Sequence, residues 1–102
     1  MSEPAAGPSG PGTVVLNLGA GVGALILYTP AGLDGEEIEI SRDGAPRTHS
    51  RVRPRRLPGQ TRYAAVYPDL AAGPYTIWAD EQHPAGQVVI AGGRVTNWSW
   101  PA

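Results

Sequence analysis

The sequence predicts an all-β protein that folds as a single antiparallel Greek-key sandwich of seven or eight strands. Apolar and polar residues alternate in short runs, most clearly over residues 36–41. Clusters of Gly, Pro and Asp separate these runs at the spacing of a sandwich, and no helical periodicity persists over the length of a helix. A third observation is the pattern formed by Leu70, Gly73 and Tyr75, which is typical of a crossing between two sheets.

The expected strands follow from the alternation and from the turn residues between them. They cover residues 13–18, 24–29, 36–41, 49–53, 61–67, 74–79, 87–91 and 94–100. The first two are expected to form a hairpin through the glycine-rich residues 19–23. A phosphate-binding loop is the alternative for these glycines, but it would need a helix after them, and a strand is expected there. Residues 57–60 are an expected loop and residues 80–86 an expected polar turn. Pro54 should end the fourth strand or keep it at a sheet edge.

The segment around Tyr75 is expected to carry the chain from one sheet to the other, with residues 68–73 forming the corner. Leu70 ends one strand, Gly73 permits the φ angle that the crossing needs, and Pro74 has a fixed φ. Tyr75 then opens the next strand, where its ring can be buried while its hydroxyl donates to the backbone upstream. We therefore assign structural roles to Leu70, Gly73 and Tyr75.

Composition limits the classes of protein that fit. Residues 13–102 are expected to form one domain, after a tail of residues 1–12 that is rich in Pro and Gly and is predicted to be disordered. The absence of cysteine excludes disulfides, thiolate metal sites and a cysteine nucleophile. Neither a signal peptide nor a membrane-spanning segment is seen, so we expect a cytoplasmic protein without membrane contact. The net charge of −1 gives no case for nucleic acid.

Arginines gather in the middle of the chain. All eight basic residues are Arg, and six of them lie between residues 47 and 62. Arg51, Arg53 and Arg55 recur at period two, so they would line one face of a strand and could dock an acidic partner or bind an anion or a nucleic acid. The alternative is a solvated edge strand whose charges prevent aggregation, with the glutamates of residues 36–39 pairing across strands.

The three tryptophans form a second group of candidate residues. Trp98 and Trp100 share one face of the last expected strand, and Trp78 could lie opposite. Exposed tryptophans can stack on sugars or anchor a protein contact. The alternative is that they pack in the core, where they would replace phenylalanine, which the chain lacks.

Catalytic and metal-binding patterns are weak. Asp80, Glu81 and His83 lie within one turn and could hold a cation, but an ordinary polar turn explains them as well. No serine motif accompanies His49 or His83, so no triad is seen. A small hydrolase would need one of these histidines in a pocket beside a carboxylate.

Residues 36–100 resemble the transthyretin-like sandwich domains, namely the carboxypeptidase regulatory-like and Cna-B prealbumin-like repeats. The matching segments are residues 38–44, which end in Asp-Gly, residues 70–77 with the tyrosine pattern, and residues 88–95. The resemblance implies a transthyretin-like or immunoglobulin-like sandwich that stiffens, spaces or docks other domains. The isopeptide bond of some Cna-B repeats needs a lysine and is excluded. The Arg-rich stretch replaces the family's usual T-D-x-x-G segment.

We therefore expect a non-enzymatic interaction or accessory module that docks on a partner protein and needs no cofactor or metal. The first expected surface is Arg51, Arg53 and Arg55, and the second is the strand with Trp98 and Trp100. A carbohydrate- or small-ligand-binding module with a tryptophan platform is the main alternative. The last strand could also pair with a second copy and form a homodimer.

Overall fold

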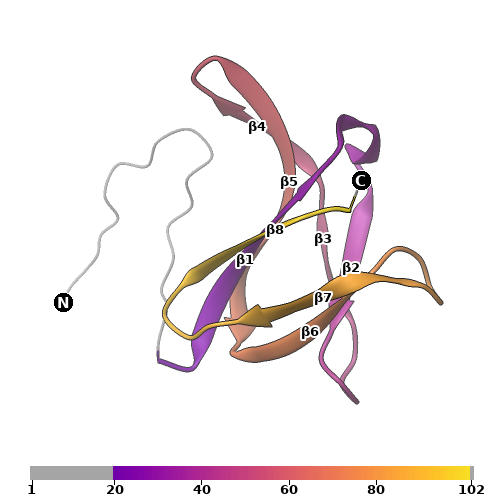
Figure 1. The fold of residues 1–102 in the computed structure, drawn as a ribbon, viewed down its shortest axis with the longest axis vertical. Coiled ribbons are helices and arrows are strands. Elements are labelled where there is room, and N and C mark those ends of the chain that lie inside the picture. Colours follow the sequence, from indigo (N-terminus) through magenta and orange to yellow (C-terminus); the bar gives the residue numbers. More distant parts are fainter. Residues whose placement is uncertain (1–19, 102) are drawn as a thin grey trace.

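The computed structural model describes residues 20–101, which form a sandwich of two four-stranded sheets (Figure 1). The first sheet has the strand order β4-β5-β1-β8, and the second sheet has the order β3-β2-β6-β7. The strands in this part of the chain are β1 (Val22–Thr29), β2 (Glu37–Ser41), β3 (Thr48–Arg51), β4 (Arg53–Leu57), β5 (Gln60–Ala71), β6 (Gly73–Trp78), β7 (Pro84–Ile90) and β8 (Val95–Ser99). The predicted all-β sandwich is confirmed. One 3-10 turn, η1 (Ala31–Leu33), follows β1, and no helix of residues 20–101 is long and apolar enough to span a membrane.

Strand β1 is one of the two inner strands of the first sheet, so both of its edges are paired. It lies antiparallel to β5 and parallel to β8. The prediction of purely antiparallel pairing is therefore wrong for β1 and β8, although the other ladders are antiparallel. The predicted hairpin between residues 13–18 and 24–29 is also wrong, since β1 has no edge left for it. Residues 13–18 themselves, like the predicted tail of residues 1–12, lie outside the described part of the chain.

The chain crosses between the sheets at Val52, in the middle of the arginine-rich stretch. The predicted single strand over residues 49–53 is instead two strands, β3 in the second sheet and β4 in the first. Val52 is fully buried between them, and its backbone holds the bend in place. Its N–H donates to the Glu36 carbonyl at 2.8 Å, and its carbonyl accepts from the Gly35 N–H at 2.9 Å. Burial of Val52 thus stabilises the bend at which the chain passes from β3 in the second sheet to β4 in the first.

A second crossing lies between β5 and β6, at the predicted tyrosine corner. Strand β5 continues to Ala71 and β6 begins at Gly73, so the predicted corner at residues 68–73 narrows to Ala72. Gly73 has a φ of +136°, which a residue with a side chain rarely adopts. Tyr75 is buried, and its hydroxyl donates to the Ala71 carbonyl at 2.8 Å. The Tyr75 hydroxyl thus ties the start of β6 to the end of β5, as the pattern around Tyr75 predicts.

Other boundaries differ by a few residues. The loop expected over residues 57–60 is a two-residue turn in which Gly59 has a φ of +77°. Strand β7 begins at Pro84, within the expected polar turn. Both differences lengthen strands at the expense of loops, because cross-strand pairing overrides the local turn signals.

The core lies between the sheets and is closed by two hydrogen bonds that join one sheet to the other. Its buried residues are Leu25, Leu27, Ile38, Ile40, Val52, Ala65, Tyr67, Leu70, Tyr75, Ile77, Val88 and Ile90. The Tyr67 hydroxyl in β5 donates to the Ile38 carbonyl in β2, and the Ser50 hydroxyl in β3 donates to the Val66 carbonyl in β5 at 2.8 Å. Burial raises the pKa of Tyr67 far above its ordinary range.

Candidate functional site

The crossing at Val52 divides the arginines between the two outer faces of the sandwich. On the second sheet, Arg51 donates to Glu37 at 2.9 Å and to the Gly35 carbonyl at 2.8 Å. Arg47 donates to Glu39 at 2.8 Å on the same face. The carboxylates of β2 therefore neutralise these two arginines. The predicted common face of Arg51, Arg53 and Arg55 is wrong, because Arg51 belongs to a different sheet from the other two.

Three other arginines share the outer face of the first sheet, and we call Arg53, Arg55 and Arg62 the arginine face. Arg55 lies directly opposite Arg62 in the β4–β5 ladder, and Arg53 lies opposite Ala64. Residues that face each other in a ladder project from the same side of the sheet. Ala64 also faces Tyr28 of β1, and the Arg62 guanidinium lies 3.7 Å from the centre of the Tyr28 ring. These side chains form one basic surface with an aromatic base.

None of the three arginines of the arginine face forms an ion pair within residues 20–101. The four strands of the first sheet contain a single acidic residue, Asp69, which lies seven residues beyond Arg62 in β5, or about 23 Å along an extended strand. Arg55 and Arg62 are therefore like charges directly opposite each other, an arrangement that destabilises a ladder. In addition, the Nε–H of Arg55 is buried without a hydrogen-bond partner. The face is electrostatically unsatisfied by the described residues.

Pro54 limits what can pair with the free edge of β4. Leu57 and Gln60 flank a two-residue turn, so they form the first hydrogen-bonded pair of the hairpin. Because such pairs alternate with non-hydrogen-bonded ones, the backbone of Pro54 points away from β5, where no N–H is needed. Pro54 therefore lies on an edge strand, as predicted, and its missing N–H removes one of the few donors that an added strand would use.

The sequence alone missed Tyr28 and gave Arg62 no special role. The signal for Arg62 is present in the chain, because Pro58 and Gly59 form a tight turn that sets the register between β4 and β5. Counting from this turn brings Arg62 opposite Arg55. No local pattern marks Tyr28, since its contact with Arg62 depends on the long-range pairing of β1 with β5.

The tryptophans do not form one platform. Trp98 and Trp100 are half-buried against the core, with ring centres 6.1 Å apart in an edge-to-face arrangement. Trp98 lies against Gly86 of β7, where an added Cβ would be 2.6 Å from the indole ring. Trp78 instead lies on the outer face of the second sheet, because it directly faces Glu39 and its indole contacts Arg47. The sheet therefore separates Trp78 from the other two.

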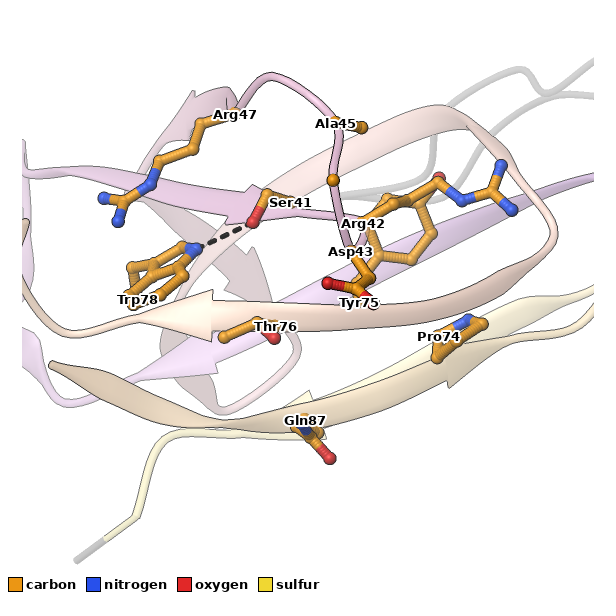
Figure 2. Close-up of a pocket in the computed structure, with 11 residues that line it drawn as sticks. Ser41, Arg42, Asp43, Ala45, Arg47, Pro74, Tyr75, Thr76, Trp78 and Gln87 are labelled. Atoms are coloured by element: carbon orange, nitrogen blue, oxygen red, sulfur yellow. Dashed lines mark hydrogen bonds between the residues drawn. The ribbon is translucent and has the colours of Figure 1, made fainter. Parts of the chain in front are cut away.

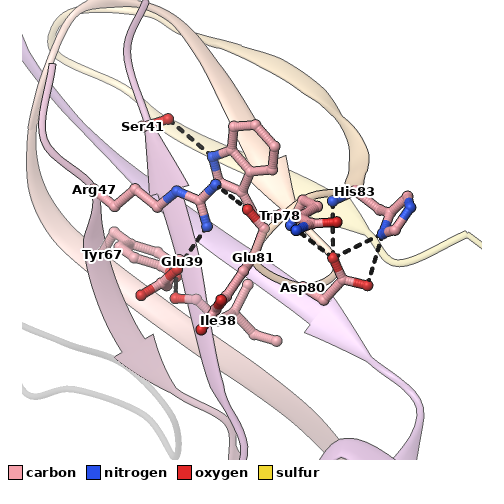
Figure 3. Close-up of polar contacts among 10 residues, drawn as sticks. Ile38, Glu39, Ser41, Arg47, Tyr67, Trp78, Asp80, Glu81 and His83 are labelled. Atoms are coloured by element: carbon pink, nitrogen blue, oxygen red, sulfur yellow. Dashed lines mark hydrogen bonds and ion pairs between the residues drawn. The ribbon is translucent and has the colours of Figure 1, made fainter. Parts of the chain in front are cut away.

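Trp78 is held on the outer face by polar contacts (Figure 3). Its Nε1–H donates to the Ser41 hydroxyl at 2.9 Å. The Arg47 guanidinium lies 3.9 Å from the centre of the indole ring, and it also donates to Glu39 and to the Glu81 carbonyl, both at 2.8 Å. A pocket of about 620 Å³ adjoins this tryptophan beneath the turn between β2 and β3 (Figure 2).

The two histidines each lie near a carboxylate. The Nδ1 atom of His83 is 2.9 Å and 3.0 Å from the two carboxylate oxygens of Asp80 in an exposed turn, and His49 is 3.9 Å from Glu37. Hydrogen bonds from the backbone of Gln82 and from His83 hold the pKa of Asp80 below its ordinary value. Within residues 20–101, neither histidine is hydrogen-bonded to a hydroxyl, and no three potential metal ligands gather.

No protein-family model, curated protein or solved structure matches this chain.

Proposed function

We propose that this domain is a non-enzymatic docking module, and that the arginine face binds an acidic segment of a partner protein. The observation that carries this role is the Arg55–Arg62 pair, two opposed cations, neither of which forms an ion pair with a carboxylate of the described chain. A carboxylate placed between the two guanidinium groups would remove the repulsion. The resemblance to transthyretin-like domains, which mostly dock or space other domains, favours the same role.

The spacing of the arginine face suits an extended segment. Arg53 and Arg55 are two residues apart in β4, which corresponds to about 6.6 Å along the strand. An extended partner segment with acidic residues at alternate positions has the same repeat, and each guanidinium can hold a carboxylate through two parallel N–H bonds. Because Pro54 removes a backbone donor from the edge, recognition would depend on side chains rather than on an added strand.

The test compares two variants that remove the same charge from opposite faces. Arg53→Gln with Arg62→Gln removes two charges from the arginine face, and Arg42→Gln with Arg51→Gln removes two from the other side of the sandwich. Each variant is used as bait in the native lysate, and the captured protein is then titrated. Because each charged hydrogen bond contributes about 1.5–3 kcal/mol, the first variant should bind at least about 100-fold more weakly. The second should bind as the wild type does.

Two further measurements test the arginine face: the salt dependence of binding and the stability of a single variant. Binding to the arginine face should weaken as ionic strength rises, since exposed charge pairs are screened by salt. Arg62→Gln should change the free energy of unfolding by less than about 1 kcal/mol, because the lost contact with the Tyr28 ring is offset by the lost repulsion from Arg55. A partner that Arg53→Gln with Arg62→Gln still retains, or a captured component that a nuclease removes, would contradict the proposed role.

A further inference from the structure

The outer face of the second sheet has a pocket that the arginine face does not use. It lies beneath the turn between β2 and β3 and has a volume of about 620 Å³, within the range of small-molecule sites. In Figure 2, this turn passes above β6, with Arg47 and Trp78 at one end and Pro74 and Tyr75 at the other. The pocket therefore has a floor of strands, a wall at each end and a partial roof.

Three hydrogen-bonding side chains cross the floor of the pocket in one row. Ser41 of β2 lies directly opposite Thr76 of β6, and Thr76 lies directly opposite Gln87 of β7. Adjacent strands are about 4.8 Å apart, so the row presents two hydroxyls and an amide at that interval. The Ser41 oxygen accepts from Trp78, which leaves its own proton free to donate. Each of these groups can both donate and accept a hydrogen bond, as the hydroxyls of a sugar do.

The indole at the end of this row is fixed before any ligand arrives. Its nitrogen is bound to Ser41, and Arg47 covers one face of its ring at 3.9 Å while Glu39 holds the guanidinium at 2.8 Å, so the rest of the indole is left to line the pocket. A fixed aromatic wall loses little conformational freedom when a ligand packs against it. The apolar C–H groups of a sugar ring are a suitable surface for such a wall.

The charges around the pocket favour a neutral ligand. Glu39 neutralises Arg47, and the remaining charged residues of the lining are Arg42 and Asp43, which have opposite signs. The Arg42 guanidinium lies 5.9 Å from the centre of the Tyr75 ring, at the far end from Trp78. A pocket with balanced charge gives no preference to a phosphate or a carboxylate.

We propose that this pocket binds a neutral sugar, with its ring against the part of the Trp78 indole that Arg47 leaves open to the pocket and its hydroxyls on Ser41, Thr76 and Gln87. The site lies on the opposite side of the sandwich from the arginine face, so it does not depend on the proposed docking role. It also replaces the predicted platform of three tryptophans with a site that contains one.

The experiment follows the three indole N–H signals of the ¹⁵N-labelled full chain by NMR. Glucose, galactose, mannose, xylose and N-acetylglucosamine are each raised to about 50 mM, so that a millimolar Kd would be detected. At least one sugar should shift the Trp78 signal and leave those of Trp98 and Trp100 in place. Thr76→Val keeps the shape of the side chain without its hydroxyl and should raise the Kd about tenfold. Thr61→Val, on the exposed hairpin of the first sheet, is the matched control and should leave the Kd unchanged.

Three results would overturn the proposal. The first is that none of the five sugars shifts the Trp78 signal. The second is that the signals of Trp98 and Trp100 move as far as that of Trp78, which would indicate a site elsewhere. The third is that Thr76→Val binds as tightly as the wild type.

Discussion

Replacement of Tyr67 by Phe tests whether the hydroxyl that joins the two sheets stabilises the fold. Tyr67 is only 3% exposed, and its hydroxyl donates to the Ile38 carbonyl on the opposite sheet. Val52 donates its N–H to the Glu36 carbonyl, and hydrogen-bonded pairs recur every second residue in an antiparallel ladder, so the N–H of Ser50 points at the Ile38 carbonyl as a second donor. Tyr67→Phe removes one buried hydrogen bond but does not leave the Ile38 carbonyl without a donor.

The expected loss follows from that geometry. A hydrogen bond of this kind contributes about 0.5–1.5 kcal/mol, whereas a fully orphaned buried carbonyl would cost about 1–3 kcal/mol. We therefore expect Tyr67→Phe to lower the free energy of unfolding by about 1 kcal/mol, which corresponds to a Tm lower by about 4–8 °C in a domain of this size. Urea denaturation and thermal unfolding both measure the change.

Alkaline pH provides an independent test of the same residue. Burial raises the pKa of Tyr67 above the value of 10.0 for an unperturbed tyrosine, so the folded state favours the protonated hydroxyl. The stability linked to this shift is complete below pH 10 and is lost as the pH rises toward the folded pKa. Wild type should therefore lose stability above pH 10 more steeply than Tyr67→Phe does.

Tyr63→Phe is the control, because Tyr63 is half-buried and its hydroxyl makes no hydrogen bond to residues 20–101. It should change the free energy of unfolding by less than about 0.5 kcal/mol. Equal stabilities for Tyr67→Phe and wild type at neutral pH, with parallel losses above pH 10, would show that the inter-sheet hydrogen bond contributes nothing.

Two other predictions concern a close contact and a turn. Gly86→Ala should lower the free energy of unfolding by about 1–3 kcal/mol, because the added Cβ would lie 2.6 Å from the Trp98 ring. Gly32→Ala is the control and should not lower it, because there is open space around Gly32. Equal urea midpoints for the two variants would disprove the contact. The Asp80 carboxyl should titrate below its ordinary range in ¹³C NMR, because Gln82 and His83 donate to it. The turn should then keep its geometry until the pH falls through that lowered pKa, and an ordinary pKa would contradict these bonds.

Local patterns in the sequence predict the strands whose two faces differ most. The alternation at Ile38 and Ile40 is clear because β2 has one buried face and one solvated face, and both isoleucines are buried as predicted. The pattern at Tyr75 is equally informative, because a sharp crossing needs particular residue types within a few positions. In both cases the structural reason lies within one short segment.

Long-range pairing explains what local patterns could not predict. Two neighbouring alternating segments favour a hairpin, but β1 pairs with β5 and β8, which lie far along the chain. The arginine-rich stretch shows the same limit of local patterns. Arginines at every second residue predict one continuous strand face, and this prediction fails when the chain changes sheets between them. Val52 is the only strongly apolar residue between Arg47 and Arg56, and its burial marks the change. A lone apolar residue inside a charged run can thus indicate a bend toward the core.

The two outer faces separate the competing explanations for the arginines. If charge served only to keep edge strands from aggregating, ion pairs such as Arg51–Glu37 would be sufficient, and the second sheet has them. The first sheet instead opposes Arg55 to Arg62, an arrangement that costs about 0.2–1 kcal/mol relative to a neutral pair. Solubility does not require that cost, since one glutamate in place of either residue would remove it. An anionic partner would convert the same arrangement into a binding site, which is why we propose docking and not edge protection as the role of the arginine face.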